Sequence, residues 1–240
     1  MLPFAKKAYT EVPKEIIRPI VVSGFLGTFF PAYLFCIAQT KIDSSLAGIL
    51  NALTPLTTIA IGTAFFNMKL GWTKWVGMIL GFAGMLVLLL NGNKEISFNY
   101  IGYASFVVIA TICYGLNVNV VSKYIQNTAP MHIATIAFTS LIIPTLIILG
   151  ITGYFTDPRL INGEWTSGTI AAAVLGILGT GVASVSFYML MKKAGPVFAS
   201  MVTYGIPFVA IGWGLITGET ITVTQMAGML IILIGVRLAN

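Results

Sequence analysis

Residues 44–67 read SSLAGILNALTPLTTIAIGTAFFN, an apolar stretch with no charged residue and with Pro55 near its middle. The same outline returns 152 positions later, where residues 196–219 read PVFASMVTYGIPFVAIGWGLITGE. Identical residues at this shift include Ala47 and Ala199, Pro55 and Pro207, and Gly62 and Gly214. Prolines and glycines held in one register favour an internal duplication.

The register extends beyond this stretch in both directions. Upstream, the matched pairs are Gly24 and Gly176, Leu26 and Leu178, Gly27 and Gly179, Thr28 and Thr180, Phe35 and Phe187, and Lys41 and Lys193. Downstream, after a slip of one residue, they are Gly77 and Gly228, Met78 and Met229, and Gly84 and Gly235. We therefore divide the single membrane domain, 1–240, into a shorter first copy, 16–92, and a longer second copy, 99–240.

The composition excludes a soluble protein. Of the 240 residues, 57% are hydrophobic and 8% are charged, and the mean hydropathy is +0.94, whereas a soluble domain carries about 25% charged residues. Apolar runs of about 20 residues are typical of membrane-spanning helices rather than barrel strands. The net charge of +6 does not indicate nucleic-acid binding, because the basic residues fall in short loops. Cys36 and Cys113 lie inside apolar spans, and we interpret them as packing residues rather than a disulfide or metal site.

The pattern predicts an all-α membrane protein with eight spans and short connections. The expected spans are 16–38, 44–66, 72–90, 100–121, 131–154, 169–191, 196–217 and 223–239. Three belong to the first copy and five to the second, because the first copy has no counterpart of 100–121 and 131–154. The simplest interpretation is a parent arrangement of ten helices.

The distribution of Lys and Arg predicts the orientation. With the N-terminus on one side, that side holds ten basic residues and the other holds three. The ten are Lys6, Lys7, Lys14, Arg18, Lys69, Lys74, Lys123, Lys192, Lys193 and Arg237, and the three are Lys41, Lys94 and Arg159. This bias places both termini in the cytoplasm. Five crossings separate the matched spans 16–38 and 169–191, so the two copies should be inverted relative to each other, as in secondary transporters.

The motifs resemble a known family. Residues 43–88, DSSLAGILNALTPLTTIAIGTAFFNMKLGWTKWVGMILGFAGMLVL, and residues 195–222, GPVFASMVTYGIPFVAIGWGLITGETIT, are similar to the matching blocks of EamA-type members of the drug/metabolite transporter superfamily. This resemblance implies ten helices, cytoplasmic termini and export of small metabolites such as amino acids or drug-like compounds. Two departures stand out: two leading helices are absent, and Asn67 replaces the acid that Glu219 retains in the second copy.

Polar side chains at mid-span mark the expected substrate site. Asn51, Thr54 and Thr58 share one helical face, and a carboxamide is costly in lipid. For the two threonines, packing between helices is the better interpretation, because Thr can bond back to its own helix. For Asn51, helix packing and cavity lining are equally favoured. Pro55 and Pro207 are candidate hinges, or simple packing bends.

The remaining site candidates lie in four other spans. The expected substrate-binding set comprises Asn51, Tyr114, Asn117, Tyr188, Thr203 and Tyr204, with Tyr33, Gln39 and Ser184 as weaker candidates. No acidic or basic side chain lies deep in any predicted span, which favours a neutral or zwitterionic substrate. No cofactor is expected, and the oligomeric state is left open.

Three functions compete at this stage. A metabolite exporter in a bacterial inner membrane, working by alternating access, fits the duplication and the resemblance. A membrane-embedded enzyme needs a catalytic cluster, which one histidine and no HExxH motif do not supply. An inactive or scaffold-like transporter fragment stays possible because of the two absent helices.

Overall fold

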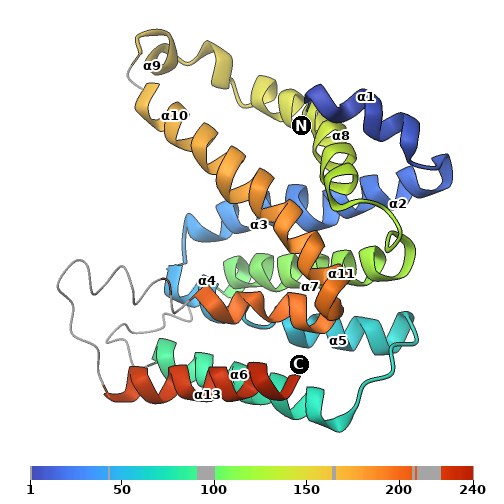
Figure 1. Ribbon diagram of the computed structural model, residues 1–240. Helices are drawn as coiled ribbons and strands as arrows, with labels where there is room; N and C mark the ends of the chain where they lie inside the picture. Colours follow the sequence, from blue (N-terminus) through green and yellow to red (C-terminus); the bar gives the residue numbers. More distant parts are fainter. Residues whose placement is uncertain are drawn as a thin grey trace.

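The computed structural model describes residues 2–42, 44–90, 101–163, 166–206, 209 and 223–239. Within these ranges every regular element is a helix (Figure 1). The expected all-α membrane class is therefore confirmed. Four helices are long and apolar enough to cross a membrane: Lys14–Gln39, Ile101–Tyr124, Pro130–Ile151 and Ser167–Gly205. Three shorter apolar helices cover Thr54–Phe65, Trp72–Val87 and Met226–Leu238.

A short helix that the sequence did not predict precedes the first span. Helix α1 (Leu2–Glu11) packs against α8 (Pro130–Ile151). It buries Ala8 there, and the hydroxyl of Tyr9 lies 3.3 Å from that of Thr139. Burial of an apolar stripe explains why this polar, mixed-charge segment is helical.

The first span is one helix with a wider turn in its middle. It consists of α2 (Lys14–Gly24), the π-helical turn η1 (Phe25–Phe29) and α3 (Phe30–Gln39). Pro31 has no N–H to donate to the carbonyl of Gly27, and its ring crowds that carbonyl, so wider winding relieves the strain. The predicted span 16–38 is confirmed, with its ends shifted by one or two residues.

The stretch that carries Pro55 forms two helices instead of one. Helix α4 (Ser44–Asn51) ends before a turn at residues 52–53, and α5 (Thr54–Phe65) follows. Pro55 cannot donate a backbone hydrogen bond to Asn51. The hydroxyl of Thr54 donates to the Asn51 carbonyl oxygen at 2.7 Å instead. The bend expected at Pro55 is therefore a complete break between two helices.

The remaining helices follow the predicted order. They are α6 (Trp72–Leu90), α7 (Ile101–Tyr124), α8, η3 (Tyr154–Thr156), α9 (Pro158–Ile161), α10 (Thr166–Val174), η4 (Leu175–Val182), α11 (Ala183–Ser200), η5 (Met201–Gly205) and α13 (Val223–Ala239). Ten of the 22 residues of the predicted span 196–217, Pro207 among them, lie outside the described residues. The number of eight spans therefore stays a prediction.

A sharp turn inside α11 separates two predicted spans. Gly195 has φ 85° and ψ 170°, a conformation that a side chain makes costly. Pro196 then begins the next helical segment, where its fixed φ suits a first turn. The expected boundary between 169–191 and 196–217 is therefore real, although the helical winding resumes at once.

Helices α6 and α13 form an antiparallel pair with touching backbones (Figure 1). A Cβ atom on Gly84 would lie 2.8 Å from the carbonyl oxygen of Gly228, and one on Gly235 would lie 2.5 Å from that of Gly77. Gly77 matches Gly228 in the sequence register, and Gly84 matches Gly235. The contact of Gly84 with Gly228 is therefore equivalent to the contact of Gly235 with Gly77, with the roles of the first and second copies interchanged. A two-fold axis perpendicular to both helices produces such reciprocal contacts.

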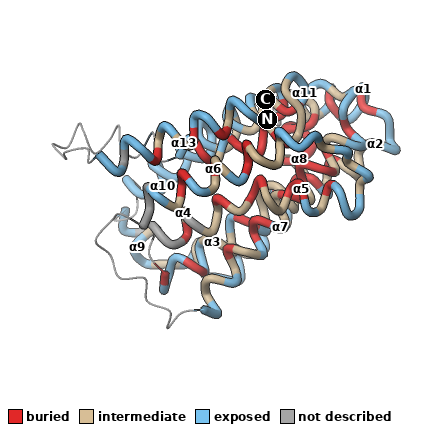
Figure 2. The backbone as a smooth tube through the Cα atoms, turned by 90° about the horizontal axis from the view of Figure 1, so that it is seen from below, coloured by how far each residue is buried: buried red, intermediate tan, exposed pale blue. Residues whose placement is uncertain are grey.

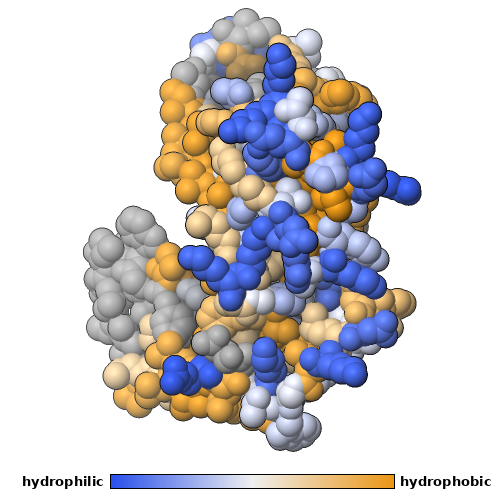
Figure 3. All heavy atoms as spheres, turned by 45° about the vertical axis from the view of Figure 1, so that its right-hand side comes forward, coloured by the Kyte–Doolittle hydropathy of each residue, from blue (hydrophilic) through white to orange (hydrophobic). Residues whose placement is uncertain are grey.

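The outer faces of the helices carry apolar side chains, as a lipid-exposed surface requires. Leu175 is 68% exposed, Ile143 70% and Ile151 80%. Figure 3 shows broad hydrophobic areas beside hydrophilic clusters on one face, and Figure 2 shows that buried positions gather where helices meet.

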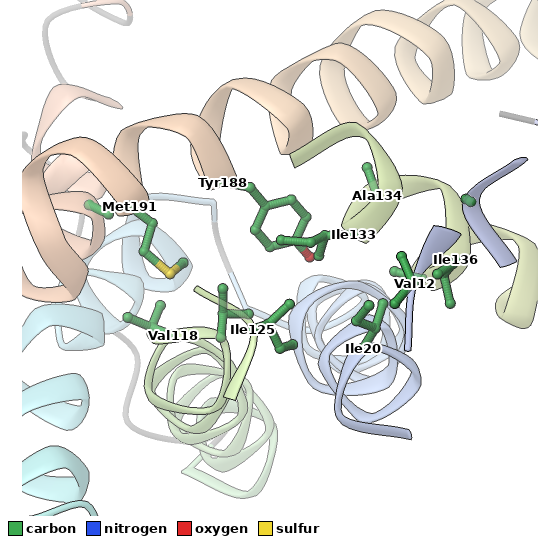
Figure 4. Close-up of a cluster of buried hydrophobic side chains, with 13 residues drawn as sticks. Val12, Ile20, Val118, Ile125, Ile133, Ala134, Ile136, Tyr188 and Met191 are labelled. Carbon is green, nitrogen blue, oxygen red and sulfur yellow. The ribbon is translucent and has the colours of Figure 1, made fainter. Parts of the chain in front are cut away.

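The main core lies between five helical segments. Side chains from α1, α2, α7, α8 and α11, together with Val12 just after α1, meet in one cluster (Figure 4). Tyr188 enters this cluster from α11 and is 5% exposed. The cluster thus packs α7, α8 and α11 of the second copy against α2 of the first copy, beside the candidate site.

Candidate functional site

A cavity of about 630 Å³ lies where η1, α4, α5, α7, η4, α11 and η5 come together. Its described lining combines apolar side chains with hydroxyl and carboxamide groups. Among the described lining residues none carries a charge. A cavity of this size and character suits a small solute held by hydrogen bonds and apolar contacts.

The structure brings five of the six predicted site residues to this cavity. They are Asn51 from α4, Tyr114 and Asn117 from α7, Tyr188 from α11, and Thr203 from η5. These residues are distributed over both copies of the repeat. The structure shows that these five residues line one cavity, and their role in substrate binding stays a prediction.

Tyr204 is the exception and needs a correction. It does not line the cavity, and its side chain is buried with 0% exposure. Its hydroxyl donates to the carbonyl oxygen of Met78 on α6 at 3.2 Å. Its ring lies on Gly81, where a Cβ atom would overlap it. Tyr204 therefore joins η5 to α6, and its ring is not offered to a solute.

Residues matched by the repeat lie on the same cavity. Three pairs separated by 152 positions line it together: Gly27 and Gly179, Asn51 and Thr203, and Thr54 and Ile206. The π-helical turns follow the same rule, because η1 covers 25–29 and η4 includes 177–181. Such turns widen a helix and are frequent at functional sites. Both copies thus contribute matched segments to one space.

A buried hydrogen-bonded group forms one wall of the cavity. The hydroxyl of Ser23 donates to Oδ1 of Asn117 at 2.6 Å and lies 3.4 Å from the hydroxyl of Tyr188. Ser23 is fully buried, while Asn117 and Tyr188 are each 5% exposed. This group links α2, α7 and α11, so the wall is held by helices from both copies.

The Asn117 carboxamide packs directly against the backbone of Gly27. A Cβ atom at position 27 would overlap Nδ2 of Asn117. The absence of a side chain therefore lets the carboxamide approach the helix closely. Gly27 lies four residues after Ser23, on the same helical face.

The threonines near Pro55 bond to nearby backbone groups, and Thr54 also lines the cavity. Thr54 bonds to Asn51, and the hydroxyl of Thr58 donates to the carbonyl oxygen of Thr54 at 2.8 Å. Thr57, which the sequence analysis did not select, donates to the carbonyl oxygen of Thr111 on α7 at 2.9 Å. These hydroxyls satisfy backbone groups at the helix break and between helices.

Sequence reasoning missed Ser23, and it recognised Gly27 only as part of the repeat. A serine in an apolar span carries little signal by itself, since it can bond to its own helix. The spacing of Ser23 and Gly27 gives a weak indication of a shared face. Their partner Asn117 lies 94 residues beyond Ser23, so only tertiary structure brings them together.

A second, apolar groove of about 890 Å³ adjoins the cavity. It is lined by residues of η1, α3, α8, η4 and α11, and it shares Thr28 and Ser186 with the cavity. Over the ranges that the structure describes, no three His, Cys, Asp or Glu side chains gather as a metal site would require.

Comparison with known proteins identifies the family. Residues 1–90 and 102–240 match the EamA-like transporter family. The chain belongs to this family. The two matched segments of this EamA-like transporter divide at nearly the same place as the two copies of the repeat.

Relatives from distant bacteria cover almost the whole chain. The uncharacterized inner membrane transporter YedA of Escherichia coli K12 is 25% identical over 230 residues, which are 93% of this chain and 72% of that protein. The uncharacterized transporter YdfC of Bacillus subtilis is 24% identical over 241 residues, which are 98% of this chain and 76% of that protein.

A solved crystal structure shares the fold. It has a TM-score of 0.73 and 19% sequence identity, and the match covers 99% of this chain and 82% of that one. At this identity the likeness concerns the fold alone.

Proposed function

We propose that this EamA-like transporter moves small neutral or zwitterionic solutes across the membrane by alternating access, with the 630 Å³ cavity as the solute site. Export of metabolites such as amino acids or drug-like compounds is the expected direction. The bound solute contacts Asn51, Tyr114, Asn117, Tyr188 and Thr203. These side chains supply carboxamide, hydroxyl and aromatic groups without a charge.

The observation that carries the proposal is the pairing of matched residues on one cavity. Gly27 and Gly179 face the same space, as do Asn51 and Thr203. A site between inverted copies is the arrangement by which secondary transporters expose one solute to either side in turn. The reciprocal contacts of α6 with α13 support an axis in the membrane plane, because the two helices are antiparallel.

Two interruptions in the helices support a change of shape. One is the break at residues 52–53 between α4 and α5, and the other is the turn at Gly195 in α11. Helix interruptions of this kind let segments reorient without unfolding. Pro55 lies beside the first interruption, and Pro207 matches Pro55 in the sequence register.

The proposed location is a bacterial inner membrane with both termini in the cytoplasm. The excess of Lys and Arg on the N-terminal side supports this orientation. The E. coli relative is named an inner membrane transporter. The oligomeric state plays no part in the proposal.

Transport in proteoliposomes tests the function. Purified protein is reconstituted, and uptake of labelled neutral and zwitterionic amino acids is followed with unlabelled amino acid inside. Asn51→Ala and Tyr114→Ala should lower flux or shift solute preference. Ser140→Ala is the matched control, because Ser140 bonds only to its own helix and does not line the cavity. Flux equal to that of empty liposomes for every solute would contradict the proposal.

A further inference from the structure

Eight of the described residues that line the cavity carry a hydroxyl group. Four of them donate to backbone carbonyl oxygens of their own segments: Thr54 at 2.7 Å, Ser186 at 3.1 Å, Ser200 at 2.7 Å and Thr203 at 3.1 Å. A hydroxyl that has donated its proton can still accept a hydrogen bond. The donors that remain for a solute are the other four hydroxyl groups, of Thr28, Tyr114, Ser184 and Tyr188, and the carboxamide groups of Asn51 and Asn117.

Asn117 has an engaged oxygen and an unengaged nitrogen. Its Oδ1 accepts the proton of Ser23 at 2.6 Å, and its Nδ2 lies over Gly27 beside the cavity. Within the described residues Nδ2 has no hydrogen-bond partner. Because the side chain is only 5% exposed, an unpaired N–H pair at this position is costly unless a ligand or water accepts it.

Asn51 presents the same chemistry from the other copy. Its Oδ1 lies 3.3 Å from the hydroxyl of Thr54 and shares the proton of that hydroxyl with the Asn51 backbone carbonyl oxygen, which lies closer at 2.7 Å. No described residue accepts a proton from its Nδ2. Two carboxamides thus line one cavity with their oxygen atoms turned to internal partners and with N–H groups for which the described residues provide no acceptor.

We infer that Asn51 and Asn117 form a donor pair that selects solutes bearing a carbonyl or carboxylate oxygen, and that Ser23 and Gly27 position the Asn117 carboxamide for this contact. The inference rests on the proposed function and names its substrate class. An oxygen acceptor satisfies both carboxamides without a protein charge. An amine without a carbonyl group cannot, because an ammonium group has only donors.

Ser23 and Gly27 are positioning residues in this arrangement. Ser23 holds Oδ1 and thereby sets which end of the carboxamide faces the cavity. Gly27 leaves the space that the amide nitrogen occupies. Substituting either residue should change the binding of some solutes more than that of others, rather than weaken the binding of all solutes by the same factor.

The test uses matched probes. Phenylalaninamide and phenethylamine share a ring and an amino group and differ in the carboxamide, and leucinamide and isopentylamine form a second pair. Phenylalanine and leucine complete the set. Binding is measured as thermal stabilisation of the purified full chain in detergent, and flux is measured in proteoliposomes. Amides and amino acids should bind about tenfold or more tightly than the matched amines, as expected for a lost hydrogen bond to a buried donor.

Four variants locate the effect. Asn117→Asp should reverse the preference, because it replaces two donors with a negative charge that repels carboxylates and attracts amines. Ser23→Ala and Gly27→Ala should reduce the amide-to-amine ratio several-fold, and Asn51→Leu should do the same. Ser140→Ala and Gly150→Ala are the controls, since Gly150 has open space where its Cβ would lie. A monodisperse elution profile shows that each variant is folded.

The outcomes separate the two proposals. Equal binding of amides and amines, with flux present, would overturn the donor pair and leave the transport function intact. An unchanged amide-to-amine ratio in folded Ser23→Ala and Gly27→Ala would overturn their positioning role. If none of the six probes binds and none is transported, both proposals are overturned.

Discussion

The carboxamide of Asn119 donates from Nδ2 to the carbonyl oxygen of Thr58 at 2.8 Å, and so joins α7 to α5. The same nitrogen donates to the carbonyl oxygen of Gly115 at 2.8 Å. Asn119 is 1% exposed and does not line the cavity. It lies two residues after Asn117 on the same helix, yet the two carboxamides serve different purposes.

Asn119→Ala should therefore lower stability and spare transport. Loss of an interhelical hydrogen bond in a membrane costs about 0.5–2 kcal/mol, which a lower thermal midpoint in detergent would report. Asn117→Ala should reduce flux as well as stability, because its carboxamide lines the cavity and also accepts the proton of buried Ser23. If Asn119→Ala melts at the wild-type temperature, the assignment of its carboxamide to helix packing is wrong.

Replacing a glycine in the α6–α13 contact should destabilise the protein from either copy. Gly84→Ala and Gly235→Ala both place a methyl group within 2.8 Å of the partner backbone, and overpacking of this kind costs roughly 1–3 kcal/mol. Because the contacts are reciprocal, we expect similar reductions in the thermal midpoint. Gly150→Ala controls for the gain in helix propensity. A large effect from only one of the two substitutions would argue against the two-fold relation.

Removing the hydroxyl of a tyrosine should separate a packing role from a cavity role. Tyr204→Phe removes the hydrogen bond to Met78 and should cost about 1 kcal/mol of stability without changing solute flux. Tyr114→Phe removes a hydroxyl from the cavity lining and should change flux or preference while the thermal midpoint stays. Flux loss in well-folded Tyr204→Phe would show that Tyr204 reaches the solute after all.

Cysteine labelling tests the orientation. Cys36 and Cys113 are first replaced by alanine, and a single cysteine is then introduced at Lys193 or Asn162, both of which are exposed. In intact cells an impermeant thiol reagent should label the Asn162→Cys protein and not the Lys193→Cys protein, because the basic residues gather on the cytoplasmic side. The opposite pattern would invert the proposed topology.

The sequence by itself determined the class of the protein and the position of most of the longer helices that the structure describes. Apolar runs longer than a bilayer core have few alternatives, because backbone groups in lipid must bond within their own helix. Pro55 marked the break between α4 and α5, since the missing N–H is a local property of the chain. Asn51, Tyr114 and Asn117 were predicted at the site because polar groups at mid-span need partners.

Only the tertiary structure decided which partner each polar group has. Asn117 and Asn119 look alike in the sequence, but one meets Ser23 at the cavity and the other meets Thr58 between helices. Tyr204 has the depth and polarity expected of a site residue. Its ring instead packs on Gly81 of α6, where the absence of a side chain leaves room for it. Helical periodicity limits which residues share a face, but which neighbouring helix covers that face depends on packing between segments far apart in the chain.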